Sequence, residues 1–180
     1  MSIRAEIHVR TQEGRLQALA QSMSSVPDKR QIFLESTVVG MLNGPWVSSR
    51  DGRRAGTARA LLESFLRGDQ VVGRMPPSKN VNTVIALLNP ADDGVWEFRI
   101  GDPRPGIRIL GRFAEKDVFV ATNWVNRENF RDPVTGQDDP RKWRDEMIRC
   151  KTIWNQLFPS YNPLIGGSLH EFISNARFPI

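Results

Sequence analysis

The first part of the chain combines a strand pattern with several helical patterns of apolar residues. Apolar and polar side chains alternate over residues 3–9, which predicts a short strand with one buried face. Apolar positions at helical spacing predict helices over 15–23, 32–42 and 58–66. The run 36–39 inside the second helix is also compatible with a strand.

A polar segment, residues 46–56, separates the last two of these helices and carries Arg50, Arg53 and Arg54. Its two Gly residues and polar side chains are typical of a surface loop. Thr57 follows it as a suitable N-cap for the next helix. Three arginines in such a loop indicate a nucleic-acid phosphate contact, and an ordinary solvated loop is the alternative.

The middle of the chain changes to a strand pattern. Short turns separate one apolar run and three alternating segments: 84–88, 95–100, 107–113 and 118–124. Consecutive strands with short turns form an antiparallel meander. We expect an α+β fold in which this sheet, joined by the strand 3–9, packs on the preceding helices.

The C-terminal part predicts one long helix and an amphipathic tail. The helix covers 140–158 and has Pro at its first position. In the tail, Leu169, Phe172 and Ile173 stand at i, i+3 and i+4, and such a stripe requires burial. Either the tail docks on the protein's own sheet or it covers a groove meant for a partner.

Composition and charge narrow the class of protein. The 180 residues are 39% hydrophobic and 25% charged, which is typical of a soluble globular domain and excludes extended disorder. Lys and Arg outnumber Asp and Glu by 25 to 20, a net charge of +5, and 20 of the 25 cations are Arg. The guanidinium fork suits phosphate, so this balance favours a phosphate-bearing partner; a codon bias towards Arg is the alternative.

Several classes of site lack the residues that they need. Cys150 is the single Cys, which excludes an intrachain disulfide and a Cys-based metal cluster. His8 and His170 are the two His residues and stand at opposite ends of the chain. No stretch approaches the ~18 apolar residues of a membrane span, and the N-terminus lacks an apolar signal. We expect a cytoplasmic protein without a metal, a cofactor or a membrane contact.

Four segments carry a resemblance to a known family: Leu66–Lys79, Val95–Ile100, Gly106–Phe113 and Asp117–Ala121. In them a helix leads through a Gly- and Pro-bearing connector into strands that read Trp-Glu-Phe-Arg and Ile-Arg-Ile-Leu-Gly-Arg-Phe. Over roughly residues 66–130 the chain resembles the RelE/ParE toxin superfamily, particularly its phage-derived, HigB-like members.

The resemblance implies a RelE-like antiparallel meander packed on N-terminal helices, with extra helical segments at both ends. Residues 1–130 would form the RelE/ParE-like α+β domain with its N-terminal extension. Residues 131–180 would form a helical extension packed on the same domain.

The resemblance also implies a toxin of a toxin–antitoxin pair, held silent by an antitoxin protein. RelE-like members cut mRNA on the ribosome without a metal, so the ribosome and mRNA become expected partners. ParE-like members instead inhibit DNA gyrase. A third possibility is a non-catalytic protein of phage or mobile-element origin that binds nucleic acid, a topoisomerase or another protein.

Cleavage of RNA requires cations at the phosphoryl oxygens and groups that move protons. The resemblance puts Arg108 at the phosphate-stabilising position and Lys79 where the family carries a catalytic group. Arg99 lies on the neighbouring predicted strand, where a hairpin would bring it beside Arg108. The structural alternative is that both arginines are sheet-edge cations paired with Glu97 or Asp102.

The general acid is the missing element of this catalytic set. Where the family often has a proton donor after the last strand, this chain has Arg127, whose pKa above ~12 makes it a poor donor. Arg127 could still orient a phosphate. His170 and Tyr161 in the tail are the available substitutes for the acid, and a His with a pKa near ~6.5 titrates in the right range.

Two more arginines complete the candidate phosphate contacts. Arg74 and Arg112 lie in the basic stretch 48–112, which holds 11 cations and 7 anions. Trp96 and Trp124 lie near them in the sequence. These rings are either core side chains or stacking platforms for unpaired bases.

Overall fold

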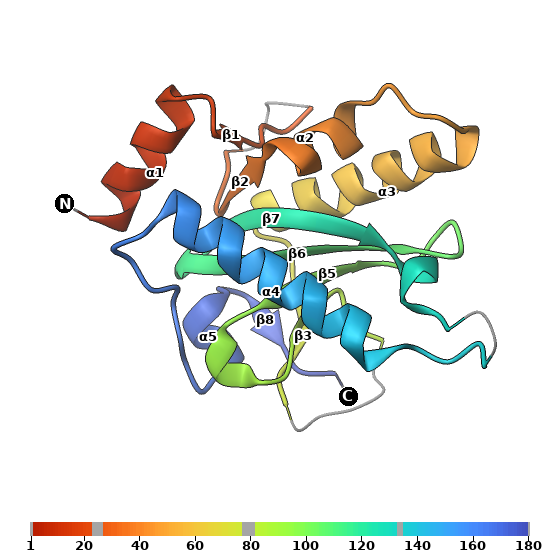
Figure 1. Ribbon diagram of the computed structural model, residues 1–180. Coiled ribbons are helices and arrows are strands. Elements are labelled where there is room, and N and C mark those ends of the chain that lie inside the picture. Colours follow the sequence, from red (N-terminus) through yellow and green to blue (C-terminus); the bar gives the residue numbers. More distant parts are fainter. Residues whose placement is uncertain (1, 23–26, 77–81, 133–134, 180) are drawn as a thin grey trace.

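The computed structural model describes residues 2–22, 27–76, 82–132 and 135–179, and these ranges form an α+β fold (Figure 1). Eight strands make one mixed sheet in the order β1-β2-β7-β6-β5-β4-β3-β8. The strands are β1 (Leu16–Ala18), β2 (Gln31–Glu35), β3 (Val71–Arg74), β4 (Ile85–Leu87), β5 (Trp96–Ile100), β6 (Ile107–Glu115), β7 (Val118–Asn126) and β8 (Ala176–Arg177). The helices are α1 (Ile3–Gln12), α2 (Ser36–Asn43), α3 (Ser49–Leu66), α4 (Pro140–Leu157) and α5 (Leu169–Phe172), with 3-10 turns η1 (Ala91–Asp93) and η2 (Arg127–Phe130).

The four strands expected in the middle of the chain are present and pair antiparallel in sequence order, from β4 to β7. A tight turn at Lys116 and Asp117 joins β6 to β7, and Asp117 adopts a positive φ of 64° there. The sheet as a whole is mixed. β2 pairs parallel with β7, and β3 pairs parallel with both β4 and β8.

Two predictions for the N-terminus are wrong. Residues 3–9 lie in helix α1, which Ser2 caps by accepting a hydrogen bond from the Ala5 amide at 3.3 Å. Ile7 is buried and Ile3 packs beside it, so two apolar residues four apart serve a helix as well as a strand. Within the predicted helix 15–23 the chain forms β1, and the sheet is extended by β1 and β2 instead of by 3–9.

The segment 32–42 holds a strand followed by a helix. Strand β2 ends at Glu35, whose carboxylate accepts a hydrogen bond from the Thr37 amide at 2.7 Å and caps α2. Helix α2 then follows without a loop. The run 36–39, which was also compatible with a strand, is helical, whereas the prediction of a helix over 32–35 is wrong because those residues form β2.

Helix α3 begins eight residues before the predicted cap Thr57. Ser48 caps it by accepting a hydrogen bond from the Asp51 amide at 3.2 Å. Most of the expected loop 46–56 is therefore the first two turns of α3. A local cap outweighs the low helix propensity of the two Gly residues in that stretch.

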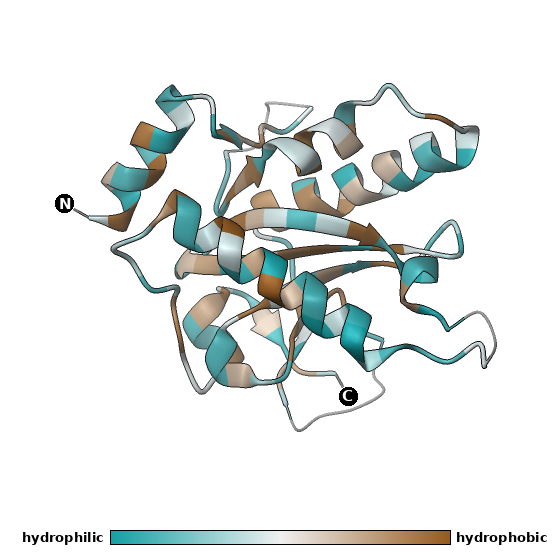
Figure 2. Cartoon of the chain, viewed as in Figure 1, coloured by the Kyte–Doolittle hydropathy of each residue, from teal (hydrophilic) through white to brown (hydrophobic). Residues whose placement is uncertain are grey.

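The two faces of the sheet carry different layers. Helices α2, α3 and α5 cover one face, over an aromatic core that includes Phe65, Phe98 and Phe113. Helix α4, which the sequence predicted over 140–158, covers the other face, and its outward side is largely hydrophilic (Figure 2). Cys150 of α4 is buried, which raises the pKa of its thiol to about 11. This thiol is a buried part of the core between α4 and the sheet.

The tail docks on the protein's own sheet. Leu169, Phe172 and Ile173 are buried in the aromatic core, and β8 adds a strand beside β3. The Ser174 amide donates a hydrogen bond to the Asp117 carboxylate at 2.8 Å. The intramolecular interpretation of the tail stripe is thus confirmed. No helix in the described ranges is long and apolar enough to cross a membrane.

Candidate functional site

An arginine-rich site lies on the α4 face of strands β5 and β6. In the antiparallel register Arg99 stands directly opposite Arg108, as the hairpin spacing predicted. Glu97 precedes Arg99 by two residues, and strand side chains alternate, so it points to the same face. The two guanidinium groups therefore converge on one carboxylate.

Glu97 is buried between these two arginines. It is 2% exposed, its Oε1 lies 3.2 Å from Arg99 Nε, and its Oε2 lies 3.2 Å from Arg108 Nε. Arg108 Nη1 donates to the Ile107 carbonyl at 2.9 Å, and Arg99 Nη1 donates to the Thr83 hydroxyl at 3.1 Å. Burial raises the pKa of Glu97 against the opposing effect of the arginines, and burial lowers the pKa of Arg108. Glu97 thus fixes the positions of both guanidinium groups.

A second acid–arginine pair reaches the site from the segment after β7. Arg127, the first residue of η2, forms a two-point ion pair with Asp138. Its guanidinium lies 5.6 Å from the Trp143 ring centroid, and Phe130 stacks on that ring at 3.8 Å. Hydrogen bonds from Arg127 hold the pKa of Asp138 below its usual range. The pKa values of the two carboxyls at this site are therefore shifted in opposite directions.

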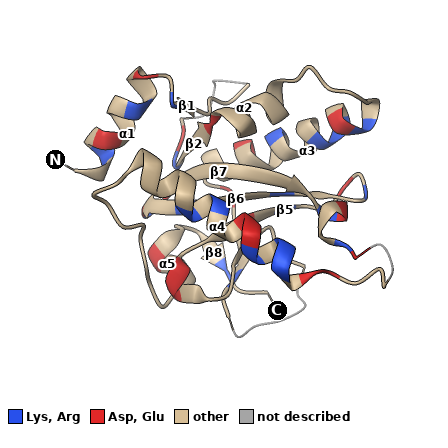
Figure 3. Ribbon diagram, in the orientation of Figure 1, with Lys and Arg blue, Asp and Glu red and all other residues tan. Residues whose placement is uncertain are grey.

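The two acid–arginine groups share one pocket of about 300 Å³. It is lined by Arg74, Leu88, Glu97, Arg99, Arg108, Arg127, Asp138 and Trp143. A larger hollow of about 640 Å³ continues from it and shares Arg108 and Arg127 with it. We call the arginines of both hollows the arginine trough: Arg74, Arg99, Arg104, Arg108, Arg127 and Arg131. In Figure 3, basic and acidic segments lie close together at the end of the sheet where the β5–β6 loop and η2 are found. The trough holds more cations than carboxylates, which suits a phosphate-bearing ligand.

The arginines predicted at 50, 53 and 54 have two different environments. Arg50 and Arg53 are exposed on the first turns of α3. Arg54 is 4% exposed, and its donors face protein acceptors: Asn126 Oδ1 at 3.0 Å and the Pro105 carbonyl. Arg54 therefore supports the trough from behind, whereas Arg50 and Arg53 lie outside it.

The remaining predicted phosphate contacts also differ. Arg74 lines the smaller pocket, where its charge counteracts the rise in the pKa of Glu97. Arg112 is buried under α4, donates to the Asp93 carbonyl and lies 5.4 Å from the Trp154 ring. Its contacts hold η1 and α4 on the sheet, so it has a structural environment.

The structure does not bring His170 to the arginines. His170 is exposed on α5, which packs on the opposite face of the sheet from Arg108, and its ring meets Phe178 edge-on at 6.5 Å. Lys79 lies outside the described residues. Tyr161 accepts a hydrogen bond from Trp154 through its carbonyl at 2.9 Å, behind α4.

The two carboxyls of the smaller pocket, Glu97 and Asp138, were not assigned to the site from the sequence. Glu97 had a signal, because alternation puts it on the face of Arg99, but it was considered only as a structural partner. Asp138 had none, because it meets Arg127 only where the loop folds back and forms a bridge with Arg131. Contacts of that kind depend on tertiary structure.

The site can bind an anion through its arginines, and its two carboxyls, Glu97 and Asp138, are engaged in ion pairs with them. Within the described part of the chain, no three His, Cys, Asp or Glu side chains gather as a metal site would need.

Comparison with known proteins assigns no family to this arrangement. The function is therefore inferred from the trough and its carboxyls. No protein-family model matches the sequence, and no match is found among curated proteins or solved structures.

Proposed function

We propose that this protein is the toxin of a toxin–antitoxin pair and cleaves mRNA on the ribosome, with the arginine trough as its RNA-binding site. The observation that carries the proposal is the convergence of Arg99, Arg108 and Arg127 with two carboxyls in one pocket. Charge grows on the phosphoryl oxygens during cleavage, and fixed guanidinium groups stabilise it. The resemblance of residues 66–130 to the RelE/ParE superfamily supports the same function.

The pocket offers groups for the phosphate and for the first proton transfer of such a cleavage. The 2′-hydroxyl must lose a proton and attack the adjacent phosphorus, and the departing 5′-oxygen must gain a proton. Arg108 and Arg127 bind the phosphoryl oxygens in this scheme. The Asp138 carboxylate accepts the first proton in this scheme, and the second proton comes from water or from the ribosome, because Glu97 is the buried carboxylate that pairs with Arg99 and Arg108.

The test is induced expression with growth and mRNA cleavage followed in the same cells, and then cleavage by purified protein with ribosomes. Arg108→Ala removes a cation that acts on the transition state and should slow cleavage about 10²–10³-fold. Arg108→Lys should restore only part, because Lys lacks the guanidinium fork. Arg4→Ala is the matched control: it also removes one arginine, at a side chain that is 64% exposed on α1, and it should leave the cleavage rate unchanged.

Two results would count against this proposal. Wild-type protein that neither arrests growth nor cleaves mRNA rejects the nuclease. Folded Arg108→Ala that cleaves at the wild-type rate removes Arg108 from the mechanism and leaves the nuclease to other residues.

A non-catalytic binder is the second candidate, and one observation favours it. Both carboxyls of the smaller pocket are already engaged in ion pairs with arginines. A protein of this kind would hold nucleic acid, a topoisomerase or another protein without cutting. The same experiment separates the two, since a binder retains RNA in an Arg108-dependent way while no cleavage products form.

A further inference from the structure

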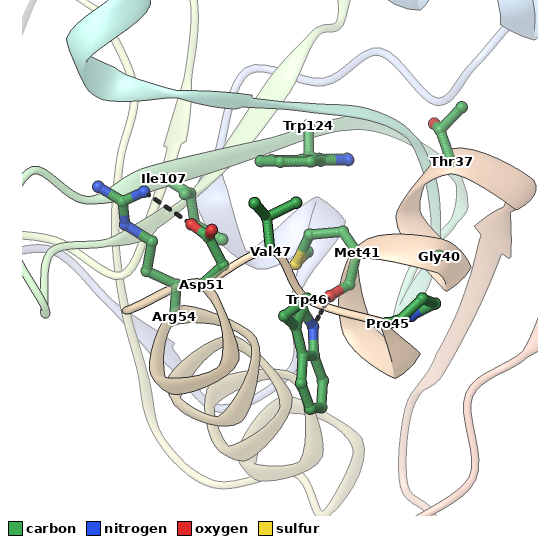
Figure 4. A pocket seen from close by; sticks show the side chains of 10 residues that line it. All are labelled: Thr37, Gly40, Met41, Pro45, Trp46, Val47, Asp51, Arg54, Ile107 and Trp124. Atoms are coloured by element: carbon green, nitrogen blue, oxygen red, sulfur yellow. Dashed lines mark hydrogen bonds and ion pairs between the residues drawn. The ribbon is translucent and has the colours of Figure 1, made fainter. Parts of the chain in front are cut away.

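An apolar pocket lies at the same end of the sheet as the arginine trough, on the opposite face. Its volume is about 330 Å³, within the range of small-ligand pockets, and Figure 4 shows the side chains that line it. Val47 is fully exposed, Trp46 is 47% exposed, and Val47 points toward the Trp124 ring. Large apolar side chains gathered in water indicate a binding surface.

Trp46 is held in a fixed position. Its Nε1 donates a hydrogen bond to the Met41 carbonyl at 2.9 Å. The indole packs closely on Gly44 and Gly52, where an added Cβ would lie 3.1 Å and 3.3 Å from the ring. Gly44 also has a φ of +75°, which favours glycine. A ring that is already ordered loses little entropy when a ligand binds.

Arg54 connects this pocket to the trough. It lines the pocket, donates to the Pro105 carbonyl and lies 3.7 Å from Glu128, and both partners line the larger hollow of the trough. Ile107 lines the pocket, and the next residue, Arg108, lines the trough. The two sites therefore meet where β6 begins and β7 ends.

We propose that this pocket binds an unpaired nucleobase of the same RNA strand whose phosphates lie on the arginine trough. The inference rests on the proposed RNA binding. A single strand alternates anionic phosphates with flat heteroaromatic rings, and the molecule presents a cationic trough on one face of the sheet and a pocket with two Trp side chains on the other, which meet at the same end of the sheet. Stacking on aromatic side chains holds any base, so the pocket adds affinity without a strong sequence preference.

The experiment compares two labelled strands by fluorescence anisotropy. One is a short single-stranded RNA, 2′-O-methylated so that it cannot be cleaved, and the other is an abasic strand of the same length. Wild-type protein should bind the strand with bases about tenfold more tightly, which corresponds to about 1.4 kcal/mol. Trp46→Ala should remove that preference and leave the affinity for the abasic strand unchanged.

Two further variants keep the test sharp. Val47→Ser changes a fully exposed side chain, so it should reduce the preference without disturbing the fold. Phe178→Ala removes another aromatic residue that is 47% exposed, and it should leave both affinities unchanged. Arg108→Ala should weaken the binding of both strands.

The outcomes separate this inference from the proposed function. No binding of either strand by wild-type protein rejects RNA binding itself, and the base pocket with it. Equal binding of both strands, lost together in Arg108→Ala, retains the trough and rejects the base pocket. If Trp46→Ala keeps the preference for the strand with bases, the base pocket is also rejected. Trp46 would then serve another purpose, such as contact with a protein partner.

Discussion

Strands β5 and β6 present two unlike surfaces that alternate residue by residue. On the α3 face, Trp96 and Phe98 pack edge-to-face on neighbouring rings at 5.1–5.5 Å. On the α4 face, Glu97 lies between Arg99 and Arg108. The aromatic face holds the strands together, and the charged face positions groups for a ligand. A substitution should therefore affect stability or binding according to the face on which it lies.

The largest effect on stability is expected from the aromatic face. Phe113→Ala removes a fully buried ring that contacts Phe65, Trp96 and Phe119. The free energy of unfolding should fall by about 3–5 kcal/mol. Urea unfolding measures this loss, and the RNA affinity of the folded fraction should stay unchanged. An affinity that falls with Phe113→Ala in fully folded protein would break the division between the faces.

On the charged face, Glu97 is expected to affect the free energy of unfolding as well as ligand binding. Glu97→Gln leaves Arg99 and Arg108, which are 26% and 11% exposed, without the buried carboxylate between them, and the loss should stay below the about 3–5 kcal/mol typical of a fully buried pair. Adding Arg108→Met should recover part of this loss, because one uncompensated charge is removed. A double-mutant cycle by chemical denaturation measures the coupling, and strictly additive losses would contradict the arrangement.

The ion pair at Asp138 should give a smaller, pH-dependent effect. Its pKa is lowered in the folded protein, so the pair stabilises above the unfolded value of about 3.9 and is lost as pH falls through the folded value. Asp138→Asn should cost less than about 1 kcal/mol at neutral pH, since the carboxylate is 37% exposed. Unfolding of both proteins between neutral and acidic pH tests this. Identical acid profiles would show that the pair adds nothing.

The smallest effect is expected at His170. His170→Ala changes an exposed side chain away from the trough, so the unfolding free energy should shift by no more than about 0.5 kcal/mol. Cleavage with ribosomes should proceed at the wild-type rate. A rate about 10²-fold lower with native circular dichroism would identify His170 as the acid.

The parts predicted from sequence are those that short-range rules determine. The period of two in 95–100 and 107–113, with a turn between them, sets Arg99 opposite Arg108. Pro140 and its Asp139 cap mark the start of α4. Periodicity was misleading at 3–9, where two isoleucines four apart satisfy a helix.

The site depended more on tertiary contacts. Ser48 alone moves the start of α3, and this puts Arg54 behind the trough instead of in a loop. Asp138 pairs with Arg127, which stands 11 positions earlier in the sequence. Neither contact follows from the periodicity of apolar residues, on which the predicted elements were based.

The pairing of β8 with β3 has a consequence for synthesis of the chain. The Asn175 side chain donates to the Gly68 carbonyl at 3.1 Å, across 107 positions. Until residues 176–177 are translated, one edge of β3 lacks the strand that pairs with it in the folded protein. A nascent chain, or one terminated before these residues, therefore exposes a strand edge that other chains can pair with. Strand β8 thus covers this edge of β3 and also removes a site of aggregation.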